Sequence, residues 1–463
     1  MMKKSNVFIN AISYVIGSFF IQGLRFLTLP FFSRIMSASD YALMSSYEAW
    51  ISVITIVVGV QASATINNAY IDYGEKKIKS YVSHIAGIGI VSAGIVALCT
   101  LLGNRLFTQM FELDIVYLLL GVLQCLFSYY LTVLITTYRI LDKAASYLAF
   151  SIINSVISIG VGMLLVWVMP NDKYVGRIYA SLIAAVLIGG TACFIIYRDG
   201  KSLYDRAHIK YAMHLSVPLV FHSLGGVILS KVDQIMLLKM VGQSTMGVYS
   251  YGTNFAHIIY VLANACNLAY SPFYYTLKSQ NNLEKIVKIN KVYIKLYLMG
   301  VSAVVLILPE IIRIMSGKAY YGAIYTAPIL AVSFMVNFLY TFLVNHEFYY
   351  KNTKYIAYAT AASAVCNTVL NFLLVPQFGD MGAAMATLIS TVFQLAAHYF
   401  IAVKIVRHYE MPLQIFLYGL LEIAVLTGVY YLFVEQMMIR IIVTVLLLAF
   451  CVHCVWKNRN ILK

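Results

Sequence analysis

Ionisable side chains occur inside long apolar stretches of this 463-residue sequence. They include Arg25, Glu48, Lys231, Asp233 and His257. If the apolar stretches cross a membrane, each charge at the bilayer centre costs roughly 2.5–3.5 kcal/mol on insertion scales. Such residues usually face a bundle interior or a water-filled path, so they are the first candidates for binding a polar substrate or a coupling ion.

Arg25 shares a helical face with two polar residues, because Ser18, Gln22 and Arg25 are spaced i, i+4 and i+7. This spacing predicts a polar stripe along a cavity, in which Gln22 and Arg25 meet a substrate and Arg25 contacts an anionic group. The alternative is an arginine that extends to the membrane interface, since its apolar stretch ends a few residues later.

Two further polar stripes stand at helical spacing. They comprise Ser45, Glu48, Ser52 and Thr55 in one stretch and Ser250, Asn254, His257 and Asn264 in another. We interpret both as the lining of a hydrophilic path, with Asn254 and Asn264 binding substrate and the ionisable Glu48 and His257 coupling transport to an ion. Hydrogen bonding between helices uses the same residue types and is the alternative.

Lys231 and Asp233 are two residues apart, so their side chains point to different helix faces and should not pair. We assign Lys231 to substrate binding and Asp233 to ion coupling, with a structural anchor as the alternative role of Asp233. A local ion pair is expected between Glu310 and Arg313 at i and i+3. Glu347 and Glu422 lie near the ends of apolar stretches and are expected at the level of the lipid headgroups.

Motifs for cofactors and metals are not convincing in this sequence. Gly200-Lys201-Ser202 resembles the end of a phosphate-binding loop, but Ile195 stands where that motif needs glycine. The segment from Cys451 to Cys454 lies in an apolar stretch and lacks a second pair of ligands. We therefore expect no cofactor, no metal site and no catalytic residue.

The composition indicates which kind of structural element carries these residues. The chain is 61% hydrophobic and only 11% charged, whereas soluble domains carry about a quarter charged residues. Apolar runs long enough to cross about 30 Å of hydrocarbon recur throughout, which predicts about fourteen membrane-spanning helices. The first run begins near Asn6 and is too long for a cleavable signal peptide, so we interpret it as a span. The predicted spans are 6–32, 41–62, 81–103, 115–137, 146–168, 177–197, 213–237, 248–275, 292–315, 323–345, 355–375, 381–403, 413–434 and 439–456.

The basic residues predict the orientation of these spans. With a cytoplasmic N-terminus, 23 of the 33 Lys and Arg residues fall on cytoplasmic segments and 7 on external loops. This asymmetry is the positive-inside pattern, so both termini are expected in the cytoplasm. The net charge of +15 is then a property of membrane loops, and nucleic acid is not an expected partner.

An internal repeat recurs at a spacing of about 205 residues. Residues 39–45 align with 244–250, and Arg34 aligns with Lys239. Later, Pro170, Gly176, Ala180, Leu182, Ile183 and Val186 recur as Pro376, Gly382, Ala386, Leu388, Ile389 and Val392. The repeat predicts two six-helix bundles, 1–205 and 206–405, related by a parallel pseudo-two-fold axis, plus two terminal helices in 406–463.

The order of several short motifs resembles a known family. The first span ends in the residues 25–30 (Arg-Phe-Leu-Thr-Leu-Pro), and Asp40-Tyr41 follows. Ser216-Val217-Pro218, the segment 231–233 and Gly247-Val248-Tyr249-Ser250 come later. Over about residues 6–405 the chain resembles the Wzx-type polysaccharide-transport flippases, relatives of the multidrug-and-toxin extruders and the lipid II flippases. Ala42 departs from the glycine usual in that family.

The resemblance implies a bacterial inner-membrane flippase, not an enzyme, that moves an undecaprenyl-diphosphate-linked oligosaccharide repeat unit by alternating access. With no nucleotide motif, an ion gradient would drive it, and a polysaccharide polymerase is a possible partner. A multidrug or lipid II exporter is the alternative on the same architecture. A membrane glycan polymerase or ligase is the alternative of another class, although its catalytic residues would need a larger external loop.

Overall fold

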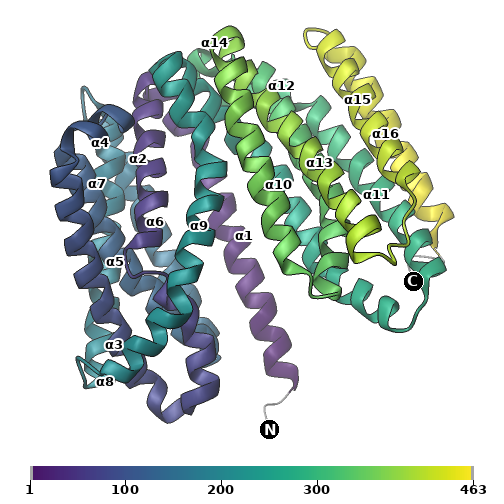
Figure 1. Cartoon of the computed structure of the whole chain (residues 1–463). Coiled ribbons are helices and arrows are strands. Elements are labelled where there is room, and N and C mark those ends of the chain that lie inside the picture. The colour runs from purple at the N-terminus through teal and green to yellow at the C-terminus, as the bar shows by residue number, and fades with distance from the viewer. Residues whose placement is uncertain (1–3, 460–463) are drawn as a thin grey trace. The chain divides into compact units, whose positions relative to one another are not determined.

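The computed structural model describes residues 4–459, and within that range leaves aside the side chains of residues 4–16, 18, 19, 222, 228 and 229. The regular elements in the described range are helices, sixteen of them α-helices, with short 3-10 and π-helical segments between some of them (Figure 1). The predicted all-α polytopic fold is therefore confirmed. Contacts divide the chain into two compact units, an N-terminal unit up to Ile235 and a C-terminal unit from Met236.

The N-terminal unit is built from eight α-helices and the first part of a ninth. They are α1 (Lys4–Ile35), α2 (Ala38–Val57), α3 (Ile66–Leu102), α4 (Asn104–Phe111), α5 (Ile115–Ile140), α6 (Ala144–Val168), α7 (Lys173–Ala184), α8 (Gly190–Gly200) and α9 (Arg206–Met240). Helix α5 packs against α2, α3, α6 and α8, and α6 packs against α1 and α7. A π-helical turn, Ala185–Gly189, joins α7 to α8, so the two form one continuous span.

The C-terminal unit contains the end of α9 and seven further α-helices. They are α10 (Gln243–Ser279), α11 (Leu283–Leu306), α12 (Leu308–Met315), α13 (Ala323–Tyr349), α14 (Thr353–Phe400), α15 (Leu413–Leu432) and α16 (Met437–Lys457). Helix α13 packs between α10 and α14, while α15 and α16 pack on α11.

The helices accommodate the predicted spans. Among the described residues, nine helices are long and apolar enough to cross a membrane, and the bent α9 becomes a tenth if its two parts form one span. One of the nine, Thr353–Val406, contains two predicted spans, which a non-helical break at Gly379 separates. The remaining predicted spans fall on α1, α2 and α10.

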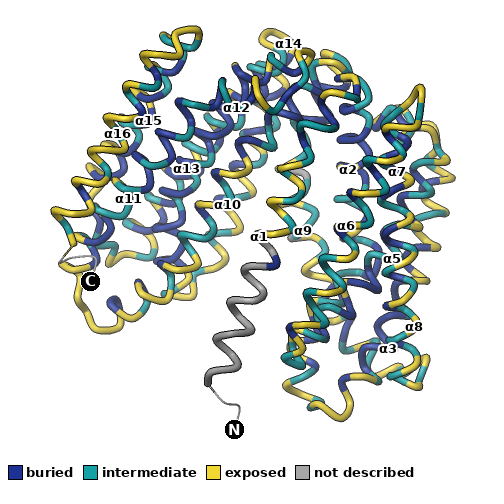
Figure 2. The backbone as a smooth tube through the Cα atoms, turned by 180° about the vertical axis from the view of Figure 1, so that it is seen from behind, coloured by how far each residue is buried: buried dark blue, intermediate teal, exposed yellow. Residues whose placement is uncertain are grey.

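Burial differs sharply between helices of the C-terminal unit (Figure 2). In the most apolar window of α13, 83% of the residues are buried, whereas in that of α16 only 17% are. The exposed side chains of α16 are large and apolar, including Leu446, Phe450 and Trp456. Since a water-facing helix would not expose such a surface, this face of α16 is suited to lipid.

Local sequence explains how several helices begin and break. At the start of α2, the Ser37 hydroxyl accepts the Asp40 N–H at 3.0 Å, while the Asp40 carboxylate accepts the Ser37 N–H at 3.3 Å. This reciprocal pair is a capping box. Before α9, the N–H groups of Ala207 and His208 donate to Asp205, and these bonds hold the pKa of that carboxyl below its ordinary value.

Candidate functional site

The predicted stripe on α1 is exposed where the structure describes it. The side chains of Gln22 and Arg25 are both exposed, whereas the side chain of Ser18 lies outside the described set. Thr28 donates its hydroxyl to the Arg25 carbonyl of the same helix at 2.8 Å.

A second guanidinium, Arg177 on the first turns of α7, lies in the same electrostatic environment. Its charge interacts with those of Glu48 and Arg25. Its guanidinium carbon stands 4.5 Å from the centre of the Phe32 ring. The Nε and Nη1 atoms of Arg177 are buried and have no hydrogen-bond partner among the described residues. Sequence reasoning missed this residue because it placed Arg177 at the external end of a span.

Helix α2 is held in place by one polar face and presents Glu48 on another. Trp50 donates its indole N–H to the Leu118 carbonyl at 2.9 Å, and Tyr47 donates to the Gln124 side chain at 2.8 Å. Both partners are on α5. The Glu48 side chain is exposed, so the carboxylate lies on the face that these contacts leave open.

The rest of the α2 stripe has a mixed role. Ser45 is buried, Ser52 donates to the Glu48 carbonyl of its own helix at 2.7 Å, and Thr55 lies 3.3 Å from the Cys125 sulfur on α5. Hydrogen bonding between and within helices, the alternative to a hydrophilic path, therefore accounts for much of this stripe. Glu48 is its exposed ionisable member.

Lys231 and Asp233 lie half-buried on α9 near Gln234. The Lys231 ammonium donates to the Gln234 side-chain oxygen at 3.3 Å, and the Asp233 carboxylate accepts the Gln234 N–H at 2.8 Å. Gln234 therefore contacts both predicted residues.

The stripe on α10 also divides into bonded and exposed members. Ser250 is buried and donates to the Met246 sulfur, while Asn254 donates to the Ser250 carbonyl at 2.9 Å. His257 is exposed, with its ring centre 5.1 Å from that of Tyr260, and Asn264 is half-buried.

A buried polar network in the C-terminal unit was not predicted. Glu347 and His398 are both fully buried, with Oε1 of the carboxyl 2.8 Å from Nδ1 of the imidazole. Nearby, the Lys278 ammonium pairs with Glu410 at 2.5 Å, and both side chains are almost fully buried. The expectation that Glu347 has no role beyond its place near the end of a span was wrong, because it forms this buried pair. Its partner is 51 residues away in sequence, so no local pattern signals the pair.

The expected local pair of Glu310 and Arg313 was also wrong. Both Glu310 oxygens accept from Arg440, at 2.6 and 2.7 Å, and the Arg440 side chain is buried. Arg313 pairs instead with Glu435 at 2.9 Å. A bidentate guanidinium–carboxylate pair satisfies more donors than the local i, i+3 geometry allows, which favours the long-range partner.

The chain shares its fold with solved helical membrane transporters. It is similar over 98% of its length to the whole chain of a lipid II flippase, MurJ, in an inward closed conformation, at 15% identity and a TM-score of 0.74. It is also similar to an inward-facing multidrug resistance MATE family transporter of the MOP superfamily, at 15% identity and a TM-score of 0.66, with 88% of this chain and 96% of that chain covered.

Residues 7–274 match the family described as polysaccharide biosynthesis protein, and the chain belongs to that family. It is 23% identical to the Lsg locus putative protein 1 of Haemophilus influenzae, with 81% of this chain and 95% of the relative covered. It is also 23% identical to a probable low-salt glycan biosynthesis flippase of Haloferax volcanii, with 85% of this chain and 84% of the relative covered. The resemblance inferred from the sequence motifs is therefore confirmed.

Proposed function

We propose that this protein is a flippase that moves an undecaprenyl-diphosphate-linked oligosaccharide repeat unit to the outer leaflet of the bacterial cytoplasmic membrane. Membership of the polysaccharide biosynthesis family and the transporter fold support this proposal. The observation that carries it is the buried Arg177 guanidinium on α7, whose Nε and Nη1 atoms have no hydrogen-bond partner among the described residues. The charges of Arg25 and Glu48 lie within electrostatic reach of it. Two guanidinium groups against one carboxylate leave an uncompensated positive charge, which an anionic substrate group would neutralise.

The predicted site residues take distinct roles in this proposal. Arg25 and Lys231 bind the diphosphate, and Gln22, Asn254 and Asn264 hydrogen-bond to the glycan. Glu48, Asp233 and His257 are the candidates for ion coupling. Exposed polar groups such as Arg25, Glu48 and His257 on spanning helices support a hydrophilic path, because facing them into hydrocarbon would be unfavourable.

The proposed transport cycle is alternating access driven by an ion gradient, without catalysis. The bundles 1–205 and 206–405 would be the two repeat halves, and 406–463 would add two helices. Both termini would lie in the cytoplasm, and a polysaccharide polymerase would act on the product on the other side of the membrane.

The test uses proteoliposomes that contain the purified full chain and a fluorescent undecaprenyl-diphosphate oligosaccharide. A membrane-impermeant glycosidase or periodate reagent reports the fraction of glycan on each side. We expect the accessible fraction to change with time when an ion gradient is imposed, and to stay constant in protein-free vesicles. Movement of lipid II alone, or of a cationic drug alone, would assign the alternative transporter roles. Longer glycan chains would assign a polymerase.

A further inference from the structure

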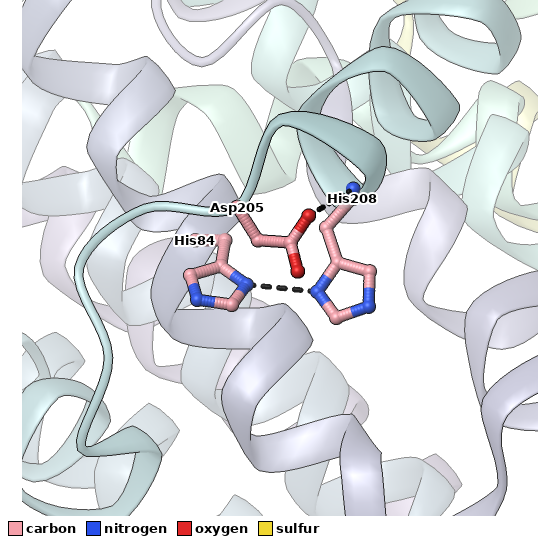
Figure 3. A group of neighbouring side chains, drawn as sticks. All are labelled: His84, Asp205 and His208. Atoms are coloured by element: carbon pink, nitrogen blue, oxygen red, sulfur yellow. Dashed lines mark hydrogen bonds between the residues drawn. The ribbon is translucent and has the colours of Figure 1, made fainter.

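Three potential metal ligands meet at one end of the N-terminal unit (Figure 3). His84 comes from α3, Asp205 precedes α9, and His208 lies in its first turn. The Nδ1 atoms of the two imidazoles are 2.8 Å apart. One nitrogen or oxygen from each of the three residues lies within 4.8 Å of the others.

Neighbouring groups orient these ligands toward a common point. The Nε2 atom of His84 lies 2.7 Å from the Ser202 hydroxyl, so that nitrogen is occupied and Nδ1 faces His208. The His208 ring is packed by the rings of Tyr73 and Tyr81, with centres 4.8 and 5.4 Å away.

The Asp205 carboxylate is placed by backbone hydrogen bonds and leaves one oxygen available. Its Oδ1 accepts the N–H of Ala207 at 2.7 Å and that of His208 at 3.3 Å. In Figure 3 the carboxylate stands over the gap between the two imidazole rings. The cluster therefore presents two ring nitrogens and a carboxylate oxygen on one side of a small space.

We propose that His84, Asp205 and His208 bind a divalent first-row transition-metal ion, with Zn²⁺ as the ion to test. Imidazole nitrogens suit Zn²⁺ and its neighbours, whereas Ca²⁺ and Mg²⁺ prefer oxygen ligands throughout. In the metal-free arrangement one Nδ1 atom donates a proton to the other. On metal binding that proton moves to Nε2 of the same ring or to solvent, so that both Nδ1 atoms can bind the ion. Bonds of about 2.0–2.2 Å require the two nitrogens to separate to about 3.3 Å, a small side-chain adjustment. Water completes the coordination.

The ion would link α3 to the start of α9, although His84 lies 124 residues from His208 in the chain. By the predicted topology this end of the unit faces the cytoplasm. A metal was not expected here from the sequence, because no short motif contains all three ligands. The alternative is that His84 and His208 form a hydrogen-bonded pair that binds no ion.

The experiment measures metal binding by the full chain, purified in detergent without a polyhistidine tag and stripped with a chelator. Isothermal titration with ZnCl₂ and metal analysis after desalting should give one Zn²⁺ per chain. Zn²⁺ should raise the unfolding temperature, because a ligand that binds the folded state stabilises it. Co²⁺ in place of Zn²⁺ should give visible absorption bands from nitrogen and oxygen ligation.

Variants locate the binding. His84→Gln, His208→Gln and Asp205→Asn should each abolish stoichiometric binding, and Asp205→Asn keeps an oxygen for the backbone bonds before α9. Ser202→Ala should weaken the affinity about 10–100-fold, since it removes the group that orients His84. His214→Gln, an exposed histidine on the same helix, is the matched control and should bind as the unaltered chain does. No binding by the unaltered chain, or full binding by folded His208→Gln protein, would overturn the proposal.

Discussion

Glu347 and His398 form a fully buried pair in which Oε1 of Glu347 lies 2.8 Å from Nδ1 of His398. They join α13 to α14 in the interior of the C-terminal unit. The second atoms of both groups, Oε2 and Nε2, are buried and have no hydrogen-bond partner among the described residues. Each side chain therefore depends on the other for its one strong polar contact.

Removing one member of this pair should destabilise the protein more than removing both. Glu347→Leu or His398→Leu leaves a buried polar partner unmatched, and breaking a buried pair in this way costs about 3–5 kcal/mol. The double leucine variant should recover much of that loss, because apolar replacement of both partners is often neutral. Thermal unfolding in detergent measures the effect. Single variants as stable as the unaltered chain would show that the pair is not structurally important.

Arg440, in the first turn of α16, should contribute more to stability than Arg313, in the last turn of α12. Arg440→Ala leaves Glu310 without its bidentate partner. It also removes the hydrogen-bond donor of two backbone carbonyls, those of Leu306 and Phe433. We expect a loss of about 3–5 kcal/mol.

Arg313→Ala is the matched control, because it removes an exposed ion pair with Glu435 that is worth about 0–1 kcal/mol. Urea or thermal denaturation in detergent compares the two variants. Equal effects would contradict the distinction between buried and exposed pairs.

The sequence predicted the all-helical membrane fold because hydrophobic run length is a local property. The predicted span that begins at Tyr41 also falls near the start of α2, where Ser37 and Asp40 cap each other. The break inside α14 was also predictable from local sequence. The loop expected between the spans 355–375 and 381–403 contains the non-helical residue Gly379.

The long-range partners were not predictable. Arg440 lies 130 residues from Glu310, and His398 lies 51 residues from Glu347. Helical spacing identifies residues that share a face, but it carries no information about which helix packs against that face. For this reason the sequence proposed the nearby Arg313 as the partner of Glu310, and it placed Arg177 only at the external end of a span.

Substitution of Gly379 should destabilise the turn between the two spans of α14. Its backbone has φ +56° and ψ −131°, a conformation that side chains with a Cβ rarely adopt. Gly379→Ala should therefore cost about 1–3 kcal/mol. Gly94→Ala is the control, since that glycine lies in regular helix with open space around its Cβ position. The measurement is the unfolding temperature of both variants, which should fall for Gly379→Ala and not for Gly94→Ala. An unchanged value for Gly379→Ala would contradict the strain argument.

Reporter fusions test the predicted topology of the spans. Fusions after Lys79, Lys210 and Lys288 should report a cytoplasmic location, and fusions near Asn104 and Lys318 an external one. The physical reason is the excess of basic residues on the segments assigned to the cytoplasm. Paired alkaline phosphatase and fluorescent-protein fusions give opposite signals at each position. An external signal at Lys210 would contradict both the span count and the arrangement in two parallel halves.

Arg25 provides the most direct test of the proposed substrate site. If its guanidinium meets the diphosphate, Arg25→Ala should abolish export while the amount of protein in the membrane stays nearly unchanged, since the side chain is exposed. Arg25→Lys should keep part of the activity, because an ammonium still attracts phosphate but lacks bidentate geometry. Cells that carry each variant are assayed for lipid-linked repeat units retained on the cytoplasmic side, together with protein abundance. A loss of folded protein in both variants would indicate a packing role, and normal export by Arg25→Ala would remove the residue from the site.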